Sequence, residues 1–153
     1  GLLGNIGQAN YGAAKMGLVA FARILAMESA SKNITANVIA PSADTRMTRS
    51  VPTPKDPDAA AVREERLRRS RADAIAPLCV YLASQGSGDV TGQVFHQRAA
   101  EISLYGLPMP IKTVHANGGW TPEMIEEKAI PSLRPRFFDI KDARSQHPGL
   151  PLD

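Results

Sequence analysis

The chain has 153 residues, of which 43% are hydrophobic and 22% charged, and its formal net charge is +3 at neutral pH. This composition is typical of one globular domain with a sizeable core and excludes disorder throughout. No apolar run approaches the about 18 residues of a membrane span, so we expect a soluble, cytoplasmic protein with no membrane partner. A single cysteine and three scattered histidines exclude an internal disulfide and provide no metal-ligand spacing, so no metal is expected.

The first predicted element is a helix over about residues 9–30, which contain no proline and carry apolar residues on nearly every face. We expect this helix to pack against a sheet on one side and against another subunit on the other. Tyr11 and Lys15 stand four positions apart near its start, so their side chains share one face. An ammonium there favours the phenolate, which makes the pair a candidate for proton transfer. Long helices also produce this spacing by chance, so the flanking sequence has to decide.

The middle of the chain predicts strands and helices in alternation. Residues 34–41, ITANVIAP, form a short β-branched run that ends at a proline and predicts a buried strand. Residues 42–58 hold three prolines and predict a long, mobile connection. A charged, arginine-rich helical stretch follows over residues 59–73, and Asp73 is expected to cap a further amphipathic helix. Residues 89–95, DVTGQVF, read as a second strand, and a helix followed by a buried strand indicates an α/β fold.

The proline content of the sequence rises after residue 101. Residues 102–153 carry most of the remaining prolines, and we interpret them as an extension of a body formed by residues 1–101. One short helix is expected near residues 122–130, with Thr121 as its cap, Pro122 in its first position and a stop near Pro131.

Three of these stretches together resemble one family. GLLGNIGQANYGAAKMG, ITANVIAP and DVTGQVF are similar in order and spacing to the second half of a short-chain dehydrogenase/reductase, over residues 1 to about 98. The stretch APSADTRMT is most similar to the branch that contains hydroxyacyl-CoA dehydrogenases. The resemblance implies the C-terminal half of a Rossmann-type, doubly wound parallel sheet without its N-terminal strands, followed by the proline-rich extension.

The resemblance also implies a site. In this family the tyrosine of a Tyr-x-x-x-Lys motif exchanges a proton with the substrate hydroxyl, and the lysine contacts the nicotinamide ribose; Tyr11 and Lys15 match that motif. Ser42 stands where the family usually has glycine, and Thr45 or Thr48 matches the threonine near the nicotinamide carboxamide. The positions that match the family's cofactor-binding residues are Tyr11, Lys15, Pro41, Ser42, Ala43 and Thr45.

The expected function is that of an NAD- or NADP-dependent oxidoreductase acting on a hydroxyl or carbonyl of a small molecule, with a CoA thioester as a candidate substrate. The family's catalytic serine and glycine-rich phosphate turn would lie before Gly1, so we expect the chain to be inactive alone. The helix over residues 9–30 is expected to form a homo-oligomer. The alternative is a non-enzymatic interaction fragment that uses the same helix.

The arginines of residues 63–71 suggest two further readings. The computed isoelectric point near 9.2 agrees with nucleic-acid binding, but Glu64 and Glu65 dilute the positive charge and no nucleic-acid motif is present, so no nucleic-acid partner is expected. Within the dehydrogenase resemblance these arginines either contact a CoA phosphate or are simply exposed to solvent.

Overall fold

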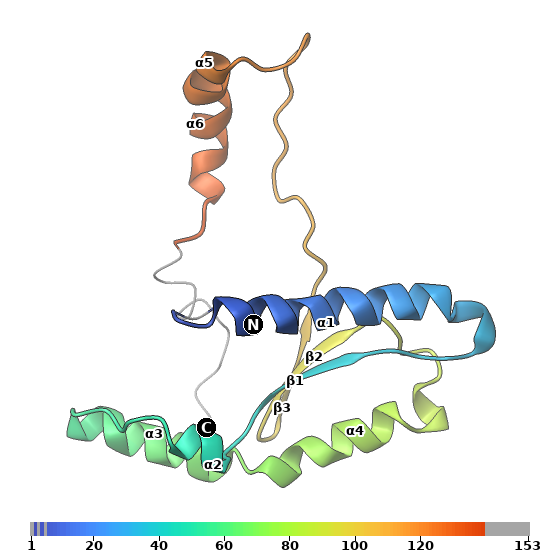
Figure 1. Cartoon of the computed structure of the whole chain (residues 1–153), viewed down its shortest axis with the longest axis vertical. Coiled ribbons are helices and arrows are strands. Elements are labelled where there is room, and N and C mark those ends of the chain that lie inside the picture. Colours follow the sequence, from blue (N-terminus) through green and yellow to red (C-terminus); the bar gives the residue numbers. More distant parts are fainter. Residues whose placement is uncertain (1, 3, 5, 140–153) are drawn as a thin grey trace. The chain divides into compact units, whose positions relative to one another are not determined.

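The structure is a computed structural model that describes residues 2, 4 and 6–139. Contacts divide the chain into two compact units, one reaching to Gly106 and one starting at Leu107. No helix in the described ranges is both long and apolar enough to cross a membrane. The first unit (Figure 1) contains α1 (Ala9–Glu28), β1 (Val38–Ser42), α2 (Arg46–Arg49), α3 (Pro57–Arg69), α4 (Ala76–Leu82), β2 (Val94–Arg98) and β3 (Glu101–Tyr105), with short 3-10 turns at Ala30–Lys32, Ala72–Ile75 and Gln85–Ser87.

The sheet has the strand order β1-β2-β3. β1 and β2 are parallel, with Val38 opposite Val94, and this pair confirms the expected α/β fold. β2 and β3 are antiparallel, with Arg98 opposite Glu101. No strand was predicted at β3, and it occupies residues assigned to the extension, so the first compact unit ends at Gly106. The division of the protein into domains at residue 101 stays a prediction.

The two faces of the sheet are covered by different helices (Figure 1). Because side chains alternate along a strand, Val38 and Val94 share one face, and both line a cavity together with Val19 of α1. Gln97 points to the opposite face, where its Nε2 donates to the carbonyl of Ala74, just before α4, at 2.6 Å. This arrangement places α1 along β1, with a cavity between them that is lined by β1 from Val38 to Pro41.

The helix expected over residues 9–30 is present as α1, but its burial within the chain is one-sided. It buries only small or β-branched residues toward the sheet: Val19, Ala22 and Ala26. Large apolar side chains on its other sides are exposed, including Phe21 at 62% and Met27 at 71%. The expectation that a second copy covers this surface stays a prediction.

Two local expectations were wrong. Residues 42–58 are not one long connection, because they include α2, which begins with a capping box in which the Thr45 and Thr48 side chains each accept from the other's backbone N–H. Asp73 caps no helix. Its carboxylate instead accepts two hydrogen bonds from Arg71, at 3.0 Å from Nε and 2.6 Å from Nη2.

In residues 107–139, the described part of the second unit, one continuous helical stretch consists of α5 (Pro122–Met124), a π-helical turn (Ile125–Ala129), α6 (Ile130–Leu133) and a 3-10 turn (Arg134–Arg136). Thr121 caps its start as expected, accepting from the N–H of Met124 at 3.2 Å. The expected stop near Pro131 was wrong. Pro131 is the second residue of α6, directly after the π turn, and the helical stretch continues through it to Arg136.

Candidate functional site

Tyr11 and Lys15 lie in the first turns of α1 on the same face of the helix. The Lys15 Nζ is 5.6 Å from the centroid of the Tyr11 ring, which confirms the expected side-by-side placement. Tyr11 is 49% exposed, so its ring is accessible from outside the chain. A phenol with an adjacent ammonium can donate or accept a proton at an accessible surface.

A cavity of about 330 Å³, here called the inner cavity, lies between α1 and β1. Tyr11, Lys15 and Pro41 line it, so the motif on α1 meets the end of β1 there. The rest of its lining is apolar, from Leu2, Leu18, Val19, Val38, Ile39, Ala40 and Val94. The inner cavity therefore presents one cation and one phenol among hydrocarbon groups.

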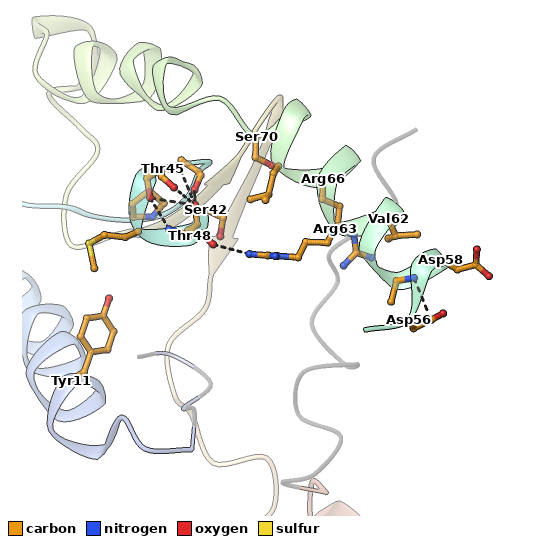
Figure 2. A pocket seen from close by; sticks show the side chains of 15 residues that line it. Tyr11, Ser42, Thr45, Thr48, Asp56, Asp58, Val62, Arg63, Arg66 and Ser70 are labelled. Atoms are coloured by element: carbon orange, nitrogen blue, oxygen red, sulfur yellow. Dashed lines mark hydrogen bonds between the residues drawn. The ribbon is translucent and has the colours of Figure 1, made fainter. Parts of the chain in front are cut away.

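A second cavity of about 1090 Å³, here called the outer cavity, shares Tyr11 and Pro41 with the inner cavity. Ser42, Ala43 and Thr45 also line it, so the two cavities bring together all six residues that the sequence proposes for the site. Figure 2 shows the Tyr11 hydroxyl pointing from α1 toward the segment that follows β1. The functions of these six residues stay predictions.

Ser42 keeps an ordinary strand backbone. It is the last residue of β1, and among the described residues other than glycine only Asn33 and Ala99 have positive φ. A glycine is therefore not needed at this position. The Ser42 Oγ lies 3.0 Å from Nε2 of His96 on β2. His96 was missed by the sequence analysis, because only the strand register shows that it faces Ser42.

The hydroxyls of Thr45 and Thr48 are fixed by the start of α2. The N–H of Thr45 donates to Thr48 Oγ1 at 2.7 Å, and the N–H of Thr48 donates to Thr45 Oγ1 at 3.2 Å. Both threonines line the outer cavity. Either can therefore be the hydroxyl that the resemblance places beside the nicotinamide.

Arg63 of α3 holds the opposite wall of the outer cavity together. Its Nη2 donates to the carbonyls of Thr48 at 2.9 Å and Val51 at 2.8 Å, and its Nη1 donates to Thr53 Oγ1 at 3.1 Å. Figure 2 shows this guanidinium pointing from α3 toward Thr48. The loop between α2 and α3 is thus tied to the helix that follows it.

The remaining arginines of α3 differ in their partners. Arg68 and Arg69 both donate to Glu65, and these hydrogen bonds lower the pKa of that carboxyl to about 2. Arg66 lines the outer cavity, and its guanidinium has no hydrogen-bond or ion-pair partner in the described part of the chain. Of these three arginines, the structure therefore leaves Arg66 available to an anion in the cavity.

Known proteins resemble the chain in both sequence and structure. The family model described as enoyl-(acyl carrier protein) reductase matches residues 2–99. Peroxisomal multifunctional enzyme A of Dictyostelium discoideum is 45% identical over 103 residues, which cover 67% of this chain and 21% of that protein. The 3-oxoacyl-[acyl-carrier-protein] reductase FabG of Salmonella typhimurium is 41% identical over 99 residues, covering 63% of this chain and 39% of FabG.

Among solved structures, a short chain dehydrogenase from Mycobacterium avium superimposes with a TM-score of 0.67 at 25% identity. The superposition covers 89% of this chain and 40% of that one. The chain thus spans well under half the length of each of these three proteins.

Proposed function

Because the chain belongs to the short-chain dehydrogenase/reductase family of oxidoreductases, we propose that it carries the proton-transfer residues of an enzyme that uses NAD or NADP. The observation that carries this proposal is the meeting of Tyr11, Lys15 and Pro41 in the inner cavity, with Ser42, Ala43 and Thr45 next to them in the outer one. These residues fit a nicotinamide group, since they combine a proton donor, a cation and hydroxyls within one continuous wall. The bound nicotinamide supplies or accepts the hydride.

Tyr11 acts at the substrate oxygen. It donates a proton to the oxygen when a carbonyl is reduced and accepts one when a hydroxyl is oxidised, and proton transfer of this kind contributes about 10²–10⁴-fold in rate. Lys15 keeps an ammonium beside the Tyr11 ring and would hold the ribose of the cofactor. Pro41, Ser42, Ala43 and Thr45 would hold the nicotinamide end.

We propose a 3-hydroxyacyl or 3-oxoacyl thioester as the substrate. FabG of Salmonella typhimurium is named a 3-oxoacyl-[acyl-carrier-protein] reductase, and this name supports a thioester substrate here. Arg66 supports it independently, because an unpaired guanidinium on the outer cavity suits a phosphate of CoA or of a phosphopantetheine arm.

The proposed activity is tested by supplying the chain with NAD(H) or NADP(H) and a panel of these thioesters. We expect no turnover from the chain alone and turnover after the N-terminal half of a related enzyme is added. Tyr11→Phe then lowers the rate by about 10²–10⁴-fold. Tyr81→Phe is the matched control, because Tyr81 is half exposed on α4 and lines neither cavity. Turnover that Tyr11→Phe leaves unchanged would refute the role of Tyr11, and turnover by the chain alone would refute its inactivity.

A second candidate function is a non-enzymatic interaction fragment. The observation that favours it is the exposure of apolar side chains on α1, among them Leu18 at 50% and Phe21 at 62%. The same surface serves a homo-oligomer under either function, so oligomerisation does not separate them. Calorimetry does, because an interaction fragment binds no nicotinamide cofactor even when an N-terminal half is present.

A further inference from the structure

We propose that His96 is a positioning residue that fixes the Ser42 hydroxyl on the wall of the outer cavity, where this hydroxyl contacts the nicotinamide end of the cofactor. The inference rests on the proposed function, because it assigns the contact to the cofactor of that reaction. Neither the Tyr-x-x-x-Lys motif nor the stretch after β1 contains His96, so the strand register is what connects it to the site.

The register of the sheet places the two side chains within reach. Ala40 of β1 lies opposite His96 of β2, and Ser42 lies opposite Arg98, so Ser42 and His96 are diagonal neighbours on one face. Their hydrogen bond joins Oγ and Nε2 at 3.0 Å. Ser42 is at the same time a lining residue of the outer cavity, together with Tyr11.

His96 is held from its other side by Tyr105. The two rings meet edge to face, with their centroids 6.4 Å apart and their planes at 86°, a favourable geometry for aromatic pairs. The Tyr105 phenol is neutral at physiological pH, and burial raises its pKa further above the usual value of about 10. Three adjacent strands thus contribute one side chain each, and the imidazole lies between the serine and the tyrosine.

The consequence for the cavity is a hydroxyl with a fixed direction. A serine hydroxyl that bonds to an imidazole on a neighbouring strand has lost its free rotation before any ligand arrives. A group held in its working orientation costs less entropy when the ligand binds. The glycine that the family usually has at this position has no such hydroxyl, so a histidine at position 96 could not act on the cavity through it.

The two threonine hydroxyls of this wall, those of Thr45 and Thr48, are oriented by different partners. Thr45 and Thr48 accept from each other's backbone N–H at the start of α2, so their orientation depends on that helix. The Ser42 hydroxyl is oriented by the sheet itself. A change at His96 should therefore affect Ser42 and leave the capping of α2 intact.

The test uses the chain together with the N-terminal half of a related enzyme, as in the activity assay, and begins with three variants. His96→Ala is expected to raise the dissociation constant of the nicotinamide cofactor by about 2–10-fold, the range of one hydrogen bond, and to leave the KM of the thioester within about twofold. His96→Gln, whose amide can still bond to the hydroxyl, should restore part of the loss. His115→Ala, in the second unit, is the matched histidine control and should change neither constant.

Making the same substitution at His96 in two backgrounds, the wild type and a Ser42→Gly protein, separates a positioning role of His96 from a structural one. In a Ser42→Gly protein, His96→Ala should have no further effect on cofactor binding, because the hydroxyl that it positions is gone. An equal effect in both backgrounds, or none in the wild-type background, would overturn the inference while hydride transfer by the wild type still upheld the proposed function.

A second readout needs no cofactor. Ser42→Ala should move the ¹⁵N resonance of the His96 imidazole in the NMR spectrum, and an unmoved resonance would overturn the inference. If the wild-type chain with the N-terminal half added neither binds a nicotinamide cofactor nor transfers hydride, the proposed function itself is refuted, and the role of His96 with it.

Discussion

Replacing Ala99 by glycine should stabilise the first unit. Ala99 is the first residue of the two-residue turn between β2 and β3, and its φ is +49°, a left-handed value that type II′ turns assign to glycine. An L-residue in this region costs about 1–2 kcal/mol. Glycine removes that cost but loses about 0.5–1 kcal/mol through the greater freedom of the unfolded chain. The expected net gain in the free energy of unfolding is about 0.5–1 kcal/mol.

The gain is measurable by thermal unfolding followed by circular dichroism, as an increase of about 2–8 °C in Tm for a unit of about 100 residues. Ala100→Gly is the matched control, since Ala100 is the next residue and has no positive φ. It should lower Tm by a similar amount, because glycine there brings only the entropy loss. If Ala99→Gly lowered Tm as Ala100→Gly does, the strain assigned to residue 99 would be wrong.

Two other predictions concern α3. Arg66→Gln should raise the KM of a CoA thioester several-fold and leave that of an N-acetylcysteamine thioester, which has no phosphate, unchanged; Arg68→Gln should change neither, because Arg68 pairs with Glu65. Equal effects on both thioesters would refute the phosphate contact. Glu65 has a folded-state pKa of about 2, below its usual 4.5, so its contribution to stability is present above about pH 4.5 and is lost as the pH falls toward 2. Tm measured against pH should therefore fall more steeply in the wild type than in Glu65→Gln across that range, and parallel curves would contradict this.

The parts of the fold that local sequence determines could be predicted. The long proline-free helix, the existence of a β-branched strand before residue 42, and the Thr121 cap all depend on residues close together in the chain, although β1 begins at Val38 rather than at residue 34 and continues through Pro41 to Ser42. β3 could not be predicted, because its turn contains Ala99 where a hairpin signal would have glycine or asparagine. In the structure it pairs with β2 along its whole length, from Glu101 opposite Arg98 to Tyr105 opposite Val94.

The candidate site also contains contacts that local sequence predicts and contacts that it does not. Tyr11 and Lys15 are four residues apart on one helix, so their proximity follows from helical pitch alone. The contact between Ser42 and His96 joins residues 54 positions apart and depends on the register of two parallel strands. The Arg66 guanidinium is likewise available to an anion because Glu65 binds Arg68 and Arg69 instead. The composition of the helix does not show which of its arginines Glu65 binds.

The three hydrogen bonds of Arg63 have a consequence for the dynamics of the outer cavity. They join Thr48 of α2 and the loop residues Val51 and Thr53 to α3, so the loop and the helix form one stiff element beside the cavity. Amide protons of the loop should then exchange with solvent at rates close to those of the first turns of α3 rather than at the rates of a free loop.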